Sequence, residues 1–321
     1  MTEIKLWQFI LDQLDKELPV VLMCVMESHG SSPGRRGFKM AVAYDEMCGS
    51  IGGGMMEYKF VELAKEKLNE NQLNYTLKKQ IHSKSAKVNQ SGMICSGEQT
   101  VYLGMVNSTD RDSIHMLIGS LQRNQHGTLN ISPTGISFGI LPLNDDYFFE
   151  IKKEDEWHYK EKTGHKNILH IIGGGHCSLA FSELMSKLDF KICLYDDRPN
   201  LNTMTGNNFV DSKLVLKSYD DLETLIESGE NVYVVIMTFG YRSDNIALRA
   251  IVNKDFKYLG VLGSQTKMDE LFKEWEGDGI SEKKLSKIHS PIGIKINSQT
   301  PFEIAVSIAG EVIAVKNKMK T

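Results

Sequence analysis

The chain has 321 residues, 41% of them hydrophobic, and a formal net charge of −4. This length allows two domains with a substantial core, and the charge balance excludes the strongly basic surface typical of nucleic-acid-binding proteins. Acidic residues among the first twenty argue against a secretory signal, and no uncharged apolar run is long enough for a membrane span. Five scattered cysteines without C-x-x-C spacing indicate reduced thiols, so we expect a cytoplasmic protein.

The first half of the chain has the pattern of an α+β domain. Strands are predicted at 20–26, 38–44, 47–51, 74–82 and 99–106, and helices at 2–18, 55–68 and 110–123. A loop at 27–37 that contains glycines and a proline joins the first two strands without a helix. This connection favours antiparallel pairing. Further strands separated by turns are expected within 127–151.

A glycine cluster precedes the second predicted helix. It consists of Gly52, Gly53 and Gly54, and Glu57 follows in the first helical turn. Glycines at a helix start expose backbone N–H groups that can cradle a phosphate or another anion. Hydroxyl and guanidinium groups of the kind that bind phosphate lie upstream, on Ser31, Ser32, Arg35 and Arg36. Two interpretations stay open: an anion site, or glycines that only permit close packing beside basic residues that face water.

Cys95 is the cysteine with the strongest indication of accessibility. It follows a polar stretch at 83–91 without apolar periodicity, which we expect to be a mobile loop, and it lies among small residues just before a strand. Cys24 and Cys193, in contrast, lie inside predicted strands. An accessible thiol whose pKa is lowered can become a nucleophile or a ligand to a soft metal. The same pattern also fits a cysteine without a chemical role.

The stretch from Ile168 to Arg198 has the pattern that opens a dinucleotide-binding fold. A short apolar strand ends in three glycines, a helix follows, and a second strand ends in Asp196 and Asp197. In such βαβ units the first glycine, here Gly173, makes a tight turn, and Gly175 lets N–H groups approach a pyrophosphate at the helix N-terminus. Ser178 replaces the third glycine of the fingerprint. The alternative is a glycine turn kept only for fold geometry.

The predicted nucleotide contacts of this unit include the acids that end its second strand. An acid in that place holds a ribose hydroxyl in proteins that bind NAD, and it repels the 2′-phosphate of NADP. Asp196 therefore favours NAD, whereas Arg198 works against that preference. The residues predicted to bind the cofactor in this half are Gly173, Gly175, His176, Asp196 and Asp197.

The rest of the chain continues the same architecture. Strands at 231–238 and 258–262 are continuously apolar and each precedes a helix, as in a parallel sheet. Thr300, Pro301 and Glu303 form a capping box that starts the last helix. The charged stretch 154–166 is the expected boundary, which gives an N-terminal α+β domain at 1–160 and a C-terminal Rossmann-like domain at 166–321. The predicted fold class is α/β, with a parallel sheet in the second domain.

Several motifs, in order along nearly the whole chain, resemble the xanthine dehydrogenase accessory factor family of the XdhC/CoxI type. They are GSSPGRRGFKM (30–40), GSIGGGMMEY (49–58), CSGE (95–98), GGGH and DDRP (within 173–199), YLGVLGSQTKM (258–268) and HSPIGIKINSQTPFEIAVSI (289–308).

This resemblance implies a chaperone that binds molybdenum cofactor, protects it during sulfuration of the molybdenum, and transfers it to a xanthine dehydrogenase-type molybdoenzyme. It also implies a homodimer and a cysteine desulfurase as a partner. The residues it places on the cofactor-handling face are Ser31, Ser32, Arg36, Gly52, Gly53, Gly54, Glu57 and Cys95. Cys95 is the residue expected to contact the metal, since molybdenum is thiophilic.

Two other functions remain alternatives. One is an NAD(P)-dependent oxidoreductase with catalytic residues in the N-terminal half, although no Ser/Tyr–Lys or His–Asp pair has a recognisable spacing. The other is a nucleotide-sensing regulatory subunit that binds NAD and has no affinity for pterin. A non-catalytic maturation chaperone is the preferred hypothesis.

Overall fold

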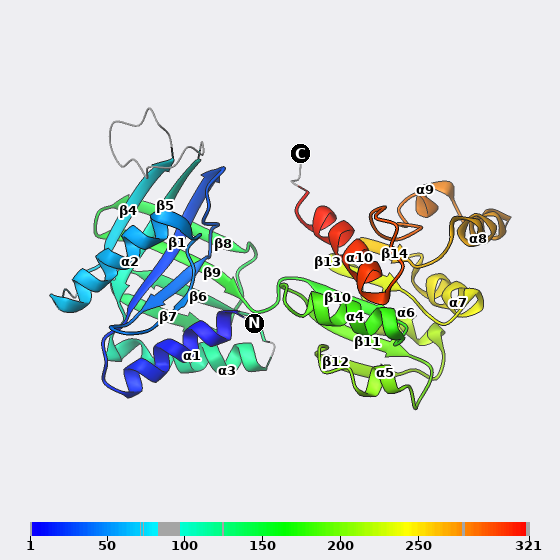
Figure 1. Cartoon of the computed structure of the whole chain (residues 1–321), viewed down its shortest axis with the longest axis horizontal. Coiled ribbons are helices and arrows are strands. Elements are labelled where there is room, and N and C mark those ends of the chain that lie inside the picture. The colour runs from blue at the N-terminus through cyan, green and yellow to red at the C-terminus, as the bar shows by residue number, and fades with distance from the viewer. Residues whose placement is uncertain are drawn as a thin grey trace. The chain divides into compact units, whose positions relative to one another are not determined.

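The computed structural model describes residues 2–70, 72, 74–82, 97–123, 125–277 and 280–318. The chain divides into two compact units, Met1–Gly164 and His165–Thr321 (Figure 1). Within the described residues, no helix is long and apolar enough to cross a membrane.

The N-terminal unit contains two antiparallel sheets with the strand orders β3-β2-β1-β5-β4 and β7-β6-β9-β8. Its elements in chain order are α1 (Thr2–Asp15), β1 (Val21–Gly30), β2 (Lys39–Val42), β3 (Met47–Gly49), α2 (Gly54–Asn69), β4 (Thr76–His82), β5 (Gly97–Met105), η1 (Ser108–Asp110), α3 (Arg111–Gln122), β6 (Gly127–Ser132), β7 (Gly135–Gly139), β8 (Tyr147–Lys153) and β9 (Glu156–Thr163). The antiparallel pairing of β1 with β2 confirms the expected hairpin-like connection.

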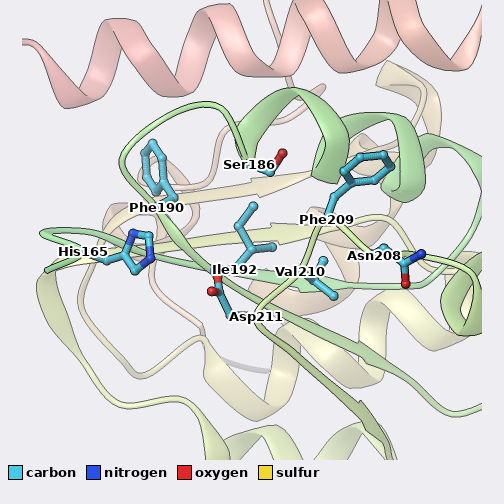
Figure 2. Close-up of a pocket in the computed structure, with 8 residues that line it drawn as sticks. All are labelled: His165, Ser186, Phe190, Ile192, Asn208, Phe209, Val210 and Asp211. Carbon is cyan, nitrogen blue, oxygen red and sulfur yellow. Dashed lines mark hydrogen bonds between the residues drawn. The ribbon is translucent and has the colours of Figure 1, made fainter. Parts of the chain in front are cut away.

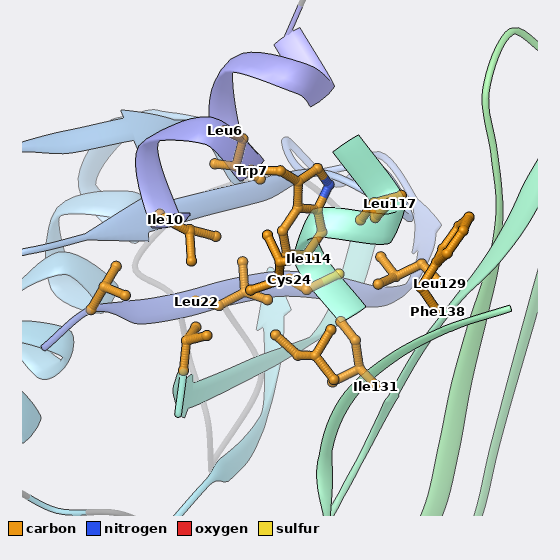
Figure 3. Close-up of a cluster of buried hydrophobic side chains, with 14 of the residues drawn as sticks. Leu6, Trp7, Ile10, Leu22, Cys24, Ile114, Leu117, Leu129, Ile131 and Phe138 are labelled. Carbon is orange, nitrogen blue, oxygen red and sulfur yellow. The ribbon is translucent and has the colours of Figure 1, made fainter. Parts of the chain in front are cut away.

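The central strand β1 is buried on both faces because each face packs against its own core. Successive side chains of a strand point to opposite sides, so alternate residues of β1 enter different cores. Leu22 and Cys24 face a core formed with α1, α3 and the four-stranded sheet (Figure 3). Val21 and Met23 face a second core formed with the apolar side of α2. The first core also contains Trp7 of α1, which is fully buried. The five-stranded sheet is therefore covered on both sides.

The strand β9 was not among the elements predicted from the sequence. The stretch 154–166 is rich in charged residues and was expected to contain the domain boundary. The two units divide near its end, between Gly164 and His165, and most of the stretch forms β9, which pairs with both β6 and β8. Its burial alternates strictly, with Trp157, Tyr159, Glu161 and Thr163 inside. The pattern was hidden because one of the inward side chains is a glutamate.

The C-terminal unit is built on a five-stranded parallel sheet of order β12-β11-β10-β13-β14. Its elements are β10 (Ile168–Ile172), α4 (His176–Met185), β11 (Lys191–Asp196), α5 (Asn202–Thr205), β12 (Ser212–Val215), η2 (Tyr219–Asp221), α6 (Leu222–Leu225), β13 (Gly229–Ile236), α7 (Tyr241–Ile251), β14 (Phe256–Val261), α8 (Gln265–Gly277), α9 (Glu282–Leu285) and α10 (Pro301–Lys316). This is the Rossmann order 3-2-1-4-5, in which the sequential order of the strands reverses between β10 and β13. The predicted fold class is confirmed.

Helices cover both faces of the parallel sheet. Apolar residues of α4 and α10 pack on one face, and those of α6, α7 and α8 pack on the other. The capping box predicted at the start of α10 is present, because the Thr300 side chain accepts from the Glu303 N–H and the Glu303 carboxylate accepts from the Thr300 N–H. The strand β12 begins directly after Asp211, whose N–H donates to the Ile192 carbonyl and whose carboxylate accepts from the Ile192 N–H.

Candidate functional site

Three segments that are distant in sequence meet around Gln99 of β5. The Ser32 hydroxyl donates to Gln99 Oε1 at 2.6 Å, and the Gly34 N–H donates to the same oxygen at 3.3 Å. Gln99 Nε2 lies 3.1 Å from the Met56 sulfur of α2. Gln99 is 1% exposed, so this buried network fixes the loop between β1 and β2 against β5 and α2. We call this region, formed by 31–36, 50–57 and 97–99, the loop junction.

Glycines allow the backbones of the loop junction to approach closely. A Cβ on Gly52 would lie 2.5 Å from the Gly34 nitrogen, and a Cβ on Gly97 would lie 2.6 Å from the Ser31 carbonyl carbon. Gly52 also has φ +127°, a conformation that side chains rarely adopt. Gly53 and Gly54 are different, because a Cβ on either would meet nothing within 4 Å. Their positive φ values explain why glycine is present there.

The N–H groups before α2 are bound by the protein itself. Glu57 accepts hydrogen bonds from the Ser50 hydroxyl at 2.6 Å, the Ile51 N–H at 2.8 Å and the Gly53 N–H at 3.0 Å. Burial alone would raise the pKa of Glu57, but these donors hold the pKa below its usual value. The N–H groups therefore converge as predicted for an anion site, and the anion that they bind is the carboxylate of Glu57.

The basic and hydroxyl groups of the loop differ in how open they are. Arg36 Nη2 lies 3.2 Å from Glu27 Oε1, so the charge of Arg36 is already paired. Arg35 is exposed, and its guanidinium donates to the Gly30 carbonyl oxygen at 3.3 Å. Ser31 is exposed, whereas Ser32 is 5% exposed and bound to Gln99. Ser31 and Arg35 are consequently the polar groups of this loop that a ligand can reach.

The thiols divide by burial. Cys95 lies outside the described residues, so its predicted role stays a prediction. Cys24 is fully buried, and burial raises its pKa to about 12, which makes it an unreactive thiol. Cys193 is buried as well, as expected from its strand. No group of three or more metal-binding side chains occurs among the described residues.

The carboxyl edge of the parallel sheet holds the predicted nucleotide motif. Gly173 has φ +107°, and a Cβ there would overlap the carbonyl oxygen of Met237 after β13. Gly175 caps α4 and has open space around it, and His176 in the first helical turn is exposed. The turn is thus tight at its first glycine and open at the helix N-terminus, where a pyrophosphate is bound in this fold.

Asp196 does not occupy the open position expected of a ribose-binding acid. It is 0% exposed and accepts from the Gly174 N–H at 2.7 Å. Arg198 donates to both carboxylate oxygens, from Nε at 2.8 Å and from Nη2 at 2.7 Å. Burial alone would raise the pKa of Asp196, but Arg198 and Gly174 hold it below its usual value. Asp197 is exposed instead and accepts from the Tyr219 hydroxyl at 3.2 Å.

Two further features of this edge involve residues that were not among the predicted site residues. Phe239, just after β13, is 88% exposed, and the Arg198 guanidinium carbon lies 5.7 Å from its ring centroid. Asp244 of α7 is buried and binds Lys267 Nζ at 2.6 Å and the Thr238 N–H at 3.0 Å. A large apolar residue directly after a parallel strand was the available signal for Phe239. Nothing in the sequence pairs Asp244 with Lys267.

A small cavity of about 200 Å³ lies at the opposite edge of the sheet (Figure 2). It is lined by His165, Ser186, Phe190, Ile192, Asn208, Phe209, Val210 and Asp211, which precede or begin the parallel strands or connect them. Ligands of open α/β sheets bind outside the carboxyl ends of the strands. The cavity is therefore separate from the nucleotide motif.

Another polar cluster ties α10 to the edge strand β14. Glu311 accepts from the Tyr258 hydroxyl at 2.6 Å and from the Gly293 N–H at 2.8 Å, and it lies 3.0 Å from His289 Nδ1. Burial alone would raise the pKa of Glu311, but these contacts hold it below its usual value. The cluster fixes the 289–293 loop.

Two models of known protein families match this sequence. Residues 13–77 match the model of the XdhC and CoxI family, and residues 169–312 match the model of the XdhC Rossmann domain. The chain belongs to the XdhC/CoxI family. The first match contains the loop at 31–36 and the Glu57-filled cradle, and the second contains the glycine turn, Arg198 and Phe239. Cys95 lies outside both matched ranges.

The curated relatives have low sequence identity to this chain. The uncharacterized protein YqeB of Escherichia coli (strain K12) is 24% identical over 309 residues, which cover 94% of this chain and 44% of YqeB. A Bacillus subtilis (strain 168) protein named as a probable xanthine dehydrogenase subunit is 23% identical over 149 residues, or 46% of this chain and 43% of that protein. The aligned regions span less than half the length of these curated relatives.

A solved structure shares the fold. The crystal structure of a protein from Bacillus halodurans described as a xanthine dehydrogenase superimposes with a TM-score of 0.73 and covers 100% of this chain and 97% of its own. The sequences are 21% identical, and what this XdhC/CoxI-family chain shares with that protein is the architecture.

Proposed function

We propose that this protein is an accessory protein of a xanthine dehydrogenase-type molybdoenzyme, which binds molybdenum cofactor and supports its sulfuration and insertion. Membership of the XdhC/CoxI family and a relative named as a probable xanthine dehydrogenase subunit support the association with such an enzyme. The protein works as a carrier in the cytoplasm and turns over no substrate of its own.

The loop junction is the observation that carries the cofactor-binding part of this proposal. The family motifs at 30–40 and 49–58, together with the start of β5, come together in one rigid surface around Gln99. The Gln99 amide is buried and makes hydrogen bonds through both its oxygen and its nitrogen, and a buried polar network of this kind rigidifies the loops that it joins. A preorganised loop surface is what retention of a reactive cofactor requires.

The residues present fit the phosphate of the cofactor in part. Arg35 and Ser31 are open and offer a guanidinium and a hydroxyl, which suit a phosphate oxygen. Glu57 holds the N–H groups of Ile51 and Gly53, so its role is to shape the loop. Cys95 is proposed to contact molybdenum or to guard its sulfur ligand, since a thiolate suits a soft metal.

Two partners complete the proposal. A cysteine desulfurase supplies the sulfur, and a second copy of the chain forms a homodimer. The outer side of α10 supports self-association, because Phe302 is 51% and Val306 is 48% exposed on it. Light scattering across micromolar concentrations tests this point, and a mass near 36 kDa throughout would contradict the homodimer.

The test of cofactor binding is purification from a host that makes molybdenum cofactor, followed by metal analysis and fluorescence of the oxidised pterin. Molybdenum and pterin should co-purify in equal amounts with the wild-type protein. Arg35→Gln and Cys95→Ala should each retain much less of both while keeping the melting temperature. Lys16→Gln, which removes an exposed cation after α1, should retain the wild-type amount. Wild-type protein free of molybdenum and pterin would reject the proposal.

The glycine turn at the carboxyl edge of the parallel sheet favours a second role, the binding of a nucleotide by the Rossmann unit. Such binding suits a regulatory function, and it is compatible with cofactor transport. An oxidoreductase remains the alternative enzyme. Steady-state consumption of NADH or NADPH without a molybdoenzyme present would favour the oxidoreductase over the carrier.

A further inference from the structure

Three side chains form a connected group across the end of β10. Asp196 ends β11, Arg198 follows it, and Phe239 follows β13, while β10 lies between those two strands. Asp196 binds the glycine turn through the Gly174 N–H and binds Arg198 through both oxygens. Arg198 in turn lies over the ring of Phe239, 5.7 Å from its centroid. The group spans the point where the strand order reverses, which is where nucleotides bind in such sheets.

Asp196 has no capacity left for a ribose hydroxyl. Its oxygens accept from the backbone N–H groups of Gly174 and Arg198 and from the side-chain Nε and Nη2 of Arg198, and no part of it reaches solvent. Acceptance of a ribose hydroxyl would require the loss of one of these charge-assisted bonds. The acid that discriminates against a 2′-phosphate in other proteins is neutralised and covered here.

Arg198 is the group that a ligand meets at this position. Its side chain is 37% exposed, and its bonds to Asp196 use Nε and Nη2. Within the described chain, Nη1 has no hydrogen-bond partner, so this nitrogen can donate to a ligand. The bidentate pair with Asp196 holds the planar guanidinium in one orientation, which reduces the ordering cost of binding a phosphate.

Phe239 adds a surface for a base. An aromatic ring that is 88% exposed in a folded unit gains from stacking, and bases of every kind stack on aromatic rings. Asp197 opposes phosphate binding at this edge, because its exposed carboxylate repels a phosphate. It is tied to the Tyr219 hydroxyl of η2, whereas Arg198 is tied to Asp196 and Phe239.

We propose that this edge binds a nucleotide carrying an extra phosphate on its adenosine ribose, such as NADP(H), in preference to one with free ribose hydroxyls. Arg198 binds that phosphate, Phe239 stacks on the base, and Asp196 is a positioning residue for both Arg198 and the glycine turn. The inference rests on the nucleotide-binding role proposed for the Rossmann unit and reverses the preference for NAD expected from the sequence.

Calorimetric titration of the full chain with two matched pairs of probes tests the proposal: NADP⁺ against NAD⁺, and 2′,5′-ADP against 5′-AMP. The phosphorylated member of each pair should bind at least about tenfold more tightly, as expected for a charge-assisted contact. Arg198→Gln should bring both ratios close to one. Arg198→Lys keeps the charge and loses the planar fork, so its ratios should lie between those of wild type and Arg198→Gln.

Phe239→Ala should weaken all four probes by about tenfold without changing either ratio, because stacking does not sense the ribose phosphate. Leu225→Ala on α6 and Lys283→Gln on α9 remove an exposed apolar side chain and an exposed cation elsewhere in the same unit, and both should leave all affinities unchanged. Melting curves establish that each variant is folded. If Arg198→Gln does not fold, the wild-type ratios and Arg198→Lys still decide the question.

The results that would contradict the proposal distinguish the preference for a ribose phosphate from nucleotide binding itself. Equal affinity within each pair, or tighter binding of NAD⁺ and 5′-AMP, would overturn the assignment of Arg198 and leave the nucleotide-binding role intact. Absence of binding for all four probes would overturn that role together with the inference. Neither result bears on the molybdenum and pterin measurement, which concerns the loop junction of the other unit.

Discussion

Lys39 and Glu161 form a buried ion pair that joins the two antiparallel sheets of the N-terminal unit. Lys39 Nζ of β2 lies 2.5 Å from Glu161 Oε2 of β9, and the two side chains are 6% and 7% exposed. The Tyr159 hydroxyl donates to the same carboxylate oxygen at 2.8 Å, and Lys39 also donates to the Gly37 carbonyl at 3.0 Å. Burial alone would lower the pKa of Lys39, but the carboxylate of Glu161 raises it above its usual value.

We expect removal of one partner to be costly. Glu161→Leu leaves the Lys39 ammonium buried without its counter-charge and should lower the free energy of unfolding by about 3–5 kcal/mol. Combining Glu161→Leu with Lys39→Met should recover most of that loss, since no buried charge remains. Lys65→Met, which breaks the exposed pair with Glu62, is the control and should cost no more than about 0.5 kcal/mol. Denaturant unfolding measures the stability of wild type and the three variants. A Glu161→Leu variant as stable as wild type would contradict the importance of the ion pair.

The first and third glycines of the turn after β10 should respond differently to substitution. Gly173→Ala places a Cβ against the Met237 carbonyl in a left-handed conformation, so we expect a loss of at least about 2 kcal/mol. Gly175→Ala has φ −74° and open space, and should cost less than about 1 kcal/mol. Gly175→Asp should fold and yet lose nucleotide affinity, because its carboxylate repels a pyrophosphate. Thermal melts test the stability of the three variants, and calorimetry tests nucleotide binding. Unchanged nucleotide binding by folded Gly175→Asp would refute the predicted loss of affinity.

Glu57 should matter for the shape of the loop before α2. Glu57→Ala removes the acceptor for the Ile51 and Gly53 N–H groups and should lower stability by about 1–2 kcal/mol. Glu57→Gln keeps one acceptor oxygen and should cost about half as much. The neighbouring Glu62→Ala, on the exposed side of α2, serves as the matched control. Equal melting temperatures for Glu57→Ala and Glu62→Ala would show that the cradle contributes nothing.

His170 predicts an acid-dependent loss of stability in the Rossmann unit. It is buried in β10, its Nδ1 lies 3.0 Å from the Tyr195 hydroxyl, and burial lowers its pKa to about 4. An unfolded histidine has a pKa of about 6.5, so the unfolded state binds the proton more tightly. The contribution is therefore present above about pH 6.5 and is lost as the pH falls to about 4, amounting to about 3 kcal/mol.

Comparison with His170→Gln isolates this term, because glutamine can still bond to Tyr195 but does not titrate in this range. Unfolding free energies measured at several pH values between 7 and 4 should fall more steeply for wild type than for the variant. Parallel pH profiles would mean that His170 is accessible to protons in the folded protein.

Local pattern was sufficient for much of the architecture. Apolar periodicity and glycine positions predicted the strands β10, β11, β13 and β14 of the parallel sheet, the glycine turn at Gly173 and the capping box at Thr300, because each depends on neighbouring residues in the chain. The same pattern failed for β9. Its buried Glu161 looks like a surface residue until Lys39, 122 positions away, is placed beside it.

The candidate sites depended on tertiary structure for the same reason. The sequence identified Glu57, Asp196 and the glycines near them as groups able to meet a ligand. It could not show that Glu57 fills its own cradle or that Arg198 covers Asp196. Nor could it place Phe239 beside Arg198, since these residues end different strands that only the parallel sheet brings to one edge. Periodicity records whether a side chain is buried, whereas its partners are decided by which distant segments the fold packs against it.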